Sequence, residues 1–412
     1  MSLLIKNIKF LIQTDSDNKT KVCGSEMNVL PYIENAYLLI ENGKISNYGS
    51  MESIPQLTTY KIIDAKGKSV MPCWVDSHTH LVFAGSREKE FVDRINGLSY
   101  EEIALRGGGI LNSANRLKDA SEDELFESAF KRLDEIIRMG TGAVEIKSGY
   151  GLSFESELKM LRVIKRLKEK SPIPIKATFL GAHALPLQYK TNKAAYINLI
   201  INEMLPAIIK ENLADYCDVF CERNYFTKEE TIQILNAASS LGIKGKVHAE
   251  QLSNSGGVEA GVACNAISVD HLEFVEEKDI AILKNSATMP TILPGAAFFL
   301  NLPHPPVRKM IDAGLPVAIA SDYNPGSSPS GNMHFMVSVG CVQYKMTPEE
   351  AINAATINSA YAMDLSNEVG SIAIGKKANL IITKEIPNYH FIPYSFAGNV
   401  IDTVIINGEI YS

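Results

Sequence analysis

The chain has 412 residues, of which 46% are hydrophobic and 21% charged, with 28 glycines and 18 prolines. This composition is typical of an ordinary globular protein, and it excludes a disulfide-stapled miniprotein, a coiled coil and a disordered tail. The formal net charge is −7 and no block of Lys or Arg is present, so we do not expect nucleic acid to be a partner.

Two further features place the protein in the cytoplasm by default. No apolar run approaches the roughly 18 residues of a membrane span, and Lys6 and Lys9 interrupt the apolar start of the chain. We therefore expect neither a membrane segment nor a secretory signal. The six cysteines are too sparse for a disulfide framework, so we expect all of them to be reduced thiols.

Both ends of the chain predict short strands joined by tight turns. Asn42-Gly43 separates two runs rich in β-branched and aromatic residues, which indicates a type I′ hairpin, and Asn407-Gly408 repeats the pattern near the other end. The run GSIAIGKKANLIIT has the same character. We predict one small β-sandwich domain assembled from residues 1–70 and 363–412.

Residues 71–362 instead alternate strands with amphipathic helices. Three S/T-x-x-E capping boxes mark helix starts, and Gly140 follows one apolar helical stripe as a stop signal. Such alternation generates a parallel sheet. The three boxes begin at Ser121, Thr227 and Thr347.

Eight apolar runs in this middle region predict the strands of an α/β fold. Most of them end in a histidine or a carboxylate, and the carboxyl ends of barrel strands converge on one rim where active sites form. With eight units and no dinucleotide-binding glycine pattern, we predict a distorted (β/α)8 TIM barrel, with abbreviated helices after the fifth and sixth strands. The runs are SVMPCWVDSHTH, GAVEIKSGYG, IKATFLGAH, CDVFCERNY, GKVHAEQ, AISVDHLEF, ATMPTILPG and PVAIASDYNPG.

The sharpest local signal is His78-Thr79-His80. Residues i and i+2 of a strand share a face, so both imidazoles can reach one metal ion. An HxH pair is common by chance, but His248, His271 and Asp322 end later strands at the same register. Imidazoles with one carboxylate suit Zn²⁺ or iron with an open position for water, and the sequence does not choose between these metals.

Several longer motifs resemble the imidazolonepropionase family of the amidohydrolase superfamily, and the similarity extends over essentially the whole chain. The resemblance implies a metal-dependent hydrolase that holds a single divalent ion, Zn²⁺ or Fe²⁺/Fe³⁺. Its ligands would be His78, His80, His248 and Asp322. The motifs are VMPCWVDSHTHLVFAGSREKEF, RGGGI, SGYGL, GAHA, HAEQLSNSGG, SVDHLE and SDYNPGSS.

Many relatives in the superfamily bridge two metals with a carbamylated lysine on strand four. This chain has Glu222 there, which favours a mononuclear centre. Lys147, at the end of the second strand, is the only nearby lysine, and we interpret it as structural. The role of Glu222 itself stays open at this stage.

The resemblance also implies a reaction. The enzyme would hydrolyse the cyclic amide of 4-imidazolone-5-propanoate to N-formimidoyl-L-glutamate, a step of histidine degradation. Asp322 would take a proton from the metal-activated water, and His271 would bond the same oxygen and stabilise the developing charge.

The same resemblance assigns substrate contacts. Arg87 would clamp the propionate through its planar fork; the alternative is a surface salt bridge with Glu88 or Glu90. Glu250 is predicted to face away from the substrate. The remaining predicted contacts are Tyr150, His183, Gln251, Asn324, Gly326 and Ser327.

Two other functions remain possible at the level of sequence. A related amidohydrolase could deaminate a purine or pyrimidine, and such an enzyme would have little use for a carboxylate clamp. A non-catalytic barrel scaffold is disfavoured, because all four inferred metal ligands are present. A homodimer is the default assembly, since it is the commonest closed oligomer.

Overall fold

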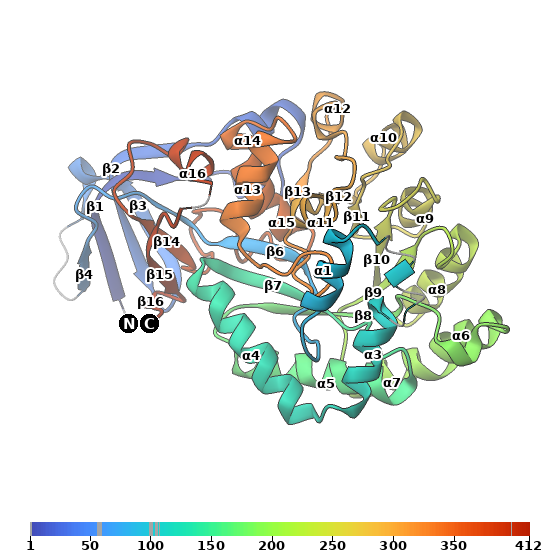
Figure 1. Cartoon of the computed structure of the whole chain (residues 1–412). Coiled ribbons are helices and arrows are strands. Elements are labelled where there is room, and N and C mark those ends of the chain that lie inside the picture. The colour runs from blue at the N-terminus through green and yellow to red at the C-terminus, as the bar shows by residue number, and fades with distance from the viewer. Residues whose placement is uncertain (1, 56–59, 99–101, 104–105, 107, 397) are drawn as a thin grey trace.

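The computed structural model describes residues 2–55, 60–98, 102–103, 106, 108–396 and 398–412. Figure 1 shows two parts: a barrel surrounded by helices, and a sheet to one side that contains both ends of the chain. This is the predicted combination of a parallel barrel and a β domain built from both termini. The boundaries predicted at residues 70 and 362 stay predictions.

Eight parallel strands form the barrel in sequence order, each paired with the next one along the chain. Register shifts in the pairing of the first two strands, and a last strand of only two residues, account for the predicted distortion. The strands are β6 (Trp74–Thr79), β7 (Thr141–Lys147), β8 (Ile175–Ala182), β9 (Tyr216–Cys221), β10 (Lys244–Ala249), β11 (Ser268–His271), β12 (Met289–Ile292) and β13 (Ala318–Ile319).

Backbone hydrogen bonds close the barrel between its first strand and the segment after its last. The amide of Asp322 donates to the carbonyl of His78 over 3.0 Å, and the amide of His80 donates to the carbonyl of Tyr323 over 2.9 Å. A parallel bridge between Thr79 and Tyr323 lies at the same place. Barrel closure therefore brings Asp322 directly beside the HxH pair.

Helices pack around these strands, and all three predicted capping boxes are present. The helices after the fifth and sixth strands, α9 and α10, have seven and eight residues, as predicted. Among the described residues, the helices are α1 (Glu88–Ile95), α3 (Gly109–Asp119), α4 (Glu122–Arg138), α5 (Phe154–Lys170), α6 (Lys193–Leu199), α7 (Leu205–Glu211), α8 (Lys228–Ser240), α9 (Gly257–Ala263), α10 (Glu277–Lys284), α11 (Pro294–Leu300), α12 (Val307–Asp312), α13 (Met333–Val342), α14 (Pro348–Asn353), α15 (Ser359–Tyr361) and α16 (Phe391–Tyr394).

Short helical turns complete the connections. Three are 3₁₀ turns, at Gly24–Asn28, Met51–Ser53 and Leu187–Tyr189. Two are π-helical, at Ile200–Met204 and Ala354–Asn358. The second π segment continues α14 into α15.

The terminal strands form one continuous sheet. In this sheet β5 lies between β1, from the start of the chain, and β14, from its end, and pairs with both. The turn residues Asn42 and Asn407 have φ of 51° and 49°, as the Asn-Gly signals predicted. The two turns lie against each other, because a Cβ added to Gly43 would be 3.0 Å from the carbonyl oxygen of Asn407. The strands are β1 (Ser2–Ile12), β2 (Tyr32–Glu41), β3 (Lys44–Ser50), β4 (Lys61–Asp64), β5 (Val70–Pro72), β14 (Leu380–Thr383), β15 (Ile401–Ile406) and β16 (Glu409–Ile410).

Two simpler expectations concern the cysteines and the membrane. All six cysteines are free thiols, as predicted. Among the residues that the structure describes, no helix combines the length and the apolar character needed to cross a bilayer.

Candidate active site

A cavity of about 300 Å³ opens at the carboxyl ends of the barrel strands. Every predicted site residue except His78 lines it, and His78 contacts the lining histidines from below, with ring centroids 5.3 Å from His80 and 4.5 Å from His248. The cavity is lined by His80, Arg87, Arg94, Leu98, Ile110, Tyr150, His183, Phe220, His248, Gln251, Leu252, His271, Leu300, Leu302, Asp322, Asn324, Gly326 and Ser327.

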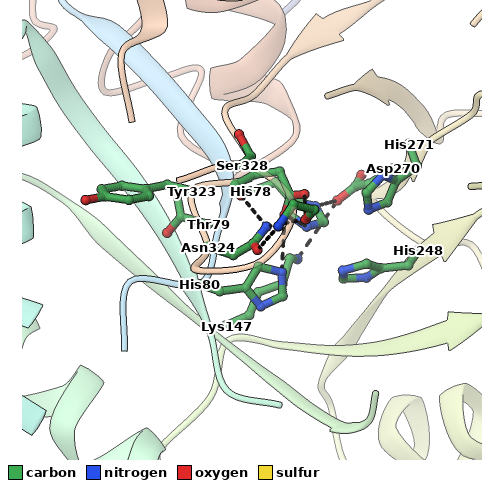
Figure 2. Close-up of polar contacts among 12 residues, drawn as sticks. His78, Thr79, His80, Lys147, His248, Asp270, His271, Tyr323, Asn324 and Ser328 are labelled. Carbon is green, nitrogen blue, oxygen red and sulfur yellow. Dashed lines mark hydrogen bonds and ion pairs between the residues drawn. The ribbon is translucent and has the colours of Figure 1, made fainter. Parts of the chain in front are cut away.

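Five buried side chains form a cluster able to hold a metal ion. Figure 2 shows the four histidines among them. Ligand atoms of His78, His80 and Asp322 lie within 4.8 Å of one another, and so do those of His78, His248 and His271. The Nε2 atoms of His78 and His80 are each 3.5 Å from Oδ1 of Asp322. One carboxylate oxygen thus faces two imidazole nitrogens.

The imidazoles of His78 and His80 are held in the neutral form that binds metals. Burial, together with neighbouring cationic groups, lowers the pKa of both rings well below the usual value. Nδ1 of His78 lies 2.6 Å from Oδ2 of Asp270. Because a carboxylate only accepts, Nδ1 carries the proton and Nε2 is left as a ligand atom.

Several buried nitrogens of this cluster have no hydrogen-bond partner among the described residues. They are Nε2 of His78, Nδ1 of His80 and Nε2 of His248. Buried polar atoms are normally satisfied, so unpartnered imidazole nitrogens in a cluster that also contains the carboxylate of Asp322 indicate a position for a ligand ion. The donor set of neutral imidazoles and one carboxylate fits a divalent transition metal.

His248 is better placed than His271 to be the third imidazole ligand. Its ring centroid lies 4.5 Å from that of His78 and 5.6 Å from that of His80. The ring of His271 lies 5.6 Å from His78 and 5.2 Å from His248, and its Nδ1 is 3.7 Å from Oε1 of the buried Glu273. His271 is therefore at the border of the cluster, facing the cavity.

A buried network of charges supports the histidines from inside the barrel. Nζ of Lys147 lies 2.8 Å from Glu145 and 2.8 Å from Asp218, and 3.9 Å from Asp270. Burial alone would lower the pKa of Lys147, but these carboxylates outweigh it and raise the pKa. Asp218 in turn lies 3.0 Å from Nδ1 of His248. Lys147 does not line the cavity, which agrees with the structural role that we predicted for it.

Arg87 lines the cavity but is already paired. Its Nε and Nη2 donate to Oε2 of Glu90 over 2.8 and 2.7 Å. Glu90 was one of the two partners considered for a surface salt bridge, yet both side chains are buried. The pairing orients the guanidinium toward the cavity instead of exposing it to solvent.

The turn after β13 is held by its own side chains. Oδ1 of Asn324 accepts from the amides of Gly326 and Ser327 over 2.7 and 2.8 Å, and its amide nitrogen donates to the carbonyl of Asp322 over 2.6 Å. Oγ of Ser327 donates to Oδ2 of Asp322 over 3.1 Å. Asn324 and Ser327 were predicted to contact substrate; in the structure they also fix the backbone and Asp322.

Tyr150, His183 and Gln251 share the cavity with the histidine cluster. The ring of His183 stacks at 5.4 Å on His80, and Nδ1 of His183 lies 2.9 Å from the carbonyl oxygen of Gly149. Burial and the nearby His248 lower the pKa of His183 to about 3, so it stays neutral. A neutral His183 that donates from Nδ1 presents Nε2 as an acceptor.

The comparisons with known proteins agree with this site. The model of the amidohydrolase family matches residues 69–411. The chain belongs to the amidohydrolase family. Together with the histidine and aspartate cluster, this membership indicates a divalent metal site.

Within the amidohydrolase family, similarity is high to proteins named imidazolonepropionase. Those of Christiangramia forsetii and Flavobacterium johnsoniae are each 58% identical to this chain over 410 residues, and each alignment covers 100% of both proteins. That of Thermoanaerobacter pseudethanolicus is 44% identical and covers 98% of this chain and 96% of the relative. The chain groups with these proteins inside the family.

Solved structures of two deaminases share the fold. A guanine deaminase from E. coli has a TM-score of 0.73 at 15% identity, covering 100% of this chain and 98% of that one. An adenosine deaminase from Xanthomonas campestris with bound zinc has a TM-score of 0.71 at 14% identity, covering 99% of this chain and 92% of that one. At such identities the likeness concerns the fold alone.

Two acidic residues whose roles the sequence left open support loops of this amidohydrolase. Glu222 accepts hydrogen bonds from the amides of Leu252 and Ser253 over 2.8 and 3.1 Å. Glu250 accepts from the amides of Gly257 and Val258 at the start of α9, over 2.7 and 3.0 Å. Neither carboxylate lines the cavity, so Glu250 faces away from it as predicted.

Sequence reasoning missed the residues that act through the histidines. Asp218 and Asp270 lie in the strand sequences CDVFC and SVDH, and their only signal was an acidic residue inside an apolar strand. A charge in such a position is costly unless it is paired, which could have indicated a buried partner. Arg94, in the cavity wall, gave no separate signal.

Proposed function

We propose that this chain is an imidazolonepropionase. It hydrolyses the cyclic amide of 4-imidazolone-5-propanoate and releases N-formimidoyl-L-glutamate, a step of histidine degradation. The observation that carries the proposal is the pairing, in one cavity, of a buried histidine and aspartate cluster with the oriented guanidinium of Arg87. The full-length similarity to proteins of that name supports it.

His78, His80, His248 and Asp322 would hold one divalent ion, Zn²⁺ or iron. The unpartnered imidazole nitrogens and the single carboxylate fit such an ion. When bound, the ion supplies Lewis-acid activation of a water molecule at neutral pH.

Asp322 and His271 would handle the protons and the charge of the reaction. Oδ1 of Asp322 faces the histidines, and Oδ2 accepts a hydrogen bond from Ser327. The carboxylate of Asp322 would accept the proton of the attacking water. The same carboxyl can return this proton to the ring nitrogen as the C–N bond breaks. His271, at the border of the cluster, would stabilise the charge that develops on the carbonyl oxygen.

The other end of the cavity would bind the substrate. Arg87 offers a planar cation for the propionate. Tyr150, His183 and Gln251 would contact the imidazolone ring, with His183 kept neutral by its low pKa. Asn324, Gly326 and Ser327 would close the site from the turn after β13.

The direct test is ring opening by the purified, metal-loaded protein. The loss of substrate absorbance monitors the reaction, and mass spectrometry identifies the product. We expect stoichiometric conversion to N-formimidoyl-L-glutamate. No turnover by protein with an intact fold and bound metal would contradict the proposal. Release of ammonia from a purine or pyrimidine would instead support the deaminase alternative.

Assembly and location stay predictions. We expect a homodimer, which light scattering coupled to size exclusion would detect as twice the 45.2 kDa chain mass. We also expect the protein in the cytoplasmic fraction of fractionated cells.

A further inference from the structure

Helix α1 presents a second guanidinium to the cavity. Arg87 is the N-cap residue of this helix and Arg94 lies in its last turn. Residues seven apart lie on the same face of a helix, and both side chains line the cavity together with Gly326. Arg87 is paired with the carboxylate of Glu90, whereas Arg94 donates to the backbone carbonyl of Gly326.

Glu90 fixes the position of Arg87. Its Oε2 accepts from Arg87, and its Oε1 accepts from the amide of Gly109 over 3.1 Å and from Asn112 over 3.1 Å. Each carboxylate oxygen is therefore occupied, and the carboxylate is anchored to α3. Since Nε and Nη2 of Arg87 are held by Glu90, its Nη1 edge is the one turned toward Gly326.

Gly326 packs directly against this edge. A Cβ added to Gly326 would lie 2.2 Å from Nη1 of Arg87 and 2.6 Å from its Cζ. Any side chain at this position would displace the guanidinium. The location of the Gly326 backbone thus determines where Arg87 can be.

Arg94 holds the other side of Gly326. Its Nη2 donates to the carbonyl oxygen of Gly326 over 2.8 Å, and its guanidinium lies 5.0 Å from the ring centroid of Phe299. The aromatic contact sets the plane of the guanidinium, and the hydrogen bond sets the position of the peptide. The backbone of Gly326 is therefore enclosed between two arginines.

The same turn continues to the metal cluster. Gly326 donates its amide to Asn324, whose side chain also bonds the carbonyl of Asp322. Ser327, the next residue, donates its hydroxyl to the carboxylate of Asp322. A displacement of Gly326 would therefore change both the guanidinium of Arg87 and the orientation of Asp322.

We propose that Arg94 is a positioning residue that, through Gly326, sets the substrate clamp and the metal-binding carboxylate at the same time. The part of this proposal that concerns the substrate rests on the proposed function. The proposal also predicts the rate at which the site loses metal, which can be measured without turnover. Arg94 is not one of the candidate metal ligands, and its hydrogen bond to the carbonyl of Gly326 gives it a route to them through the turn.

The test compares Arg94→Ala and Arg94→Lys with wild type and with Arg138→Ala. Arg138 is a matched control, because it also donates to a backbone carbonyl, that of Ser412 over 2.9 Å, but it is exposed and outside the cavity. For Arg94→Ala we expect KM to rise about 10-fold and kcat to fall several-fold. Lysine keeps the charge but not the planar fork, so Arg94→Lys should recover only part of both losses.

The second measurement is retention of metal against a chelator, followed without substrate. We expect Arg94→Ala to lose metal several-fold faster than wild type, and Arg138→Ala to match wild type. If wild type has no imidazolonepropionase activity but Arg94→Ala still loses metal faster, the proposed function fails and the positioning role stands. Unchanged KM, kcat and metal retention in Arg94→Ala would overturn the inference. If Arg94→Ala does not fold, then wild-type values of KM, kcat and metal retention in Arg94→Lys would overturn the inference.

Discussion

Nδ1 of His78 and Oδ2 of Asp270 lie 2.6 Å apart, and both side chains are completely buried. The aspartate selects the tautomer of His78 and directs its Nε2 toward Asp322. The metal site is therefore built in two layers, and the outer layer, with Asp270 and Asp218, does not line the cavity.

Replacing that aspartate tests the outer layer. In Asp270→Asn the neutral amide can no longer hold the Nδ1 proton of His78 as strongly, so we expect metal affinity to fall about 10- to 100-fold. Competition with a fluorescent chelator measures this affinity. Asp123→Asn, at a side chain that is 84% exposed, is the control and should bind metal like wild type. Equal affinity in both variants would show that Asp270 does not orient the ligand.

Removal of the metal should abolish ring opening without unfolding the barrel. The buried charge network of Lys147 and the apolar core do not depend on the ion, so circular dichroism of the chelated protein should retain the native spectrum. Activity should return on addition of Zn²⁺ or Fe²⁺, and elemental analysis of the purified protein should give one metal per chain. Two metals per chain would contradict the mononuclear site.

Arg87→Ala should raise KM for 4-imidazolone-5-propanoate about 100-fold, because a charge-assisted contact to the propionate is lost and Glu90 is left buried without its cation. Steady-state kinetics measures the change, and kcat should fall less than KM rises. Arg138→Ala, at a half-exposed surface pair, should leave both constants unchanged. A KM unaffected by Arg87→Ala would favour a substrate without a carboxylate.

Lys147→Met should destabilise the fold, because it leaves Glu145, Asp218 and Asp270 without the cation that they surround. Breaking a buried ion pair from one side costs about 3–5 kcal/mol, and we expect a loss of at least this order in the free energy of unfolding. Denaturant titration measures it. Lys168→Met removes an exposed pair with Asp215 and should change the free energy by about 0–1 kcal/mol. A stable Lys147→Met protein with altered metal content would indicate a direct role at the metal.

Gly326→Ala should weaken substrate binding. The added methyl group would overlap Nη1 of Arg87, so the guanidinium must move and KM should rise about 10-fold or more. Ser330→Ala, an exposed position of the same turn outside the cavity, is the control. A wild-type KM in Gly326→Ala would mean that Arg87 binds substrate in another position.

The sequence by itself determined the architecture and predicted which residues meet in the inner layer of the site. Strand ends, capping boxes and Asn-Gly turns are local signals, because they depend on backbone geometry within a few residues. The HxH pair and the later strand-end residues could be assigned to one rim because all barrel strands point the same way. Arg87 could be proposed by resemblance, whereas its pair with Glu90 was considered only as a surface salt bridge and is buried.

Only the tertiary structure decided how these residues are supported. His78 and Asp270 are separated by 192 positions, and Arg94 and Gly326 by 232, so no periodicity in the chain connects them. Their contacts arise because barrel closure and the docking of α1 bring distant segments together. Hydrogen bonds, steric exclusion and buried charge pairing act only at these short distances, and for this reason they are determined by the folded structure.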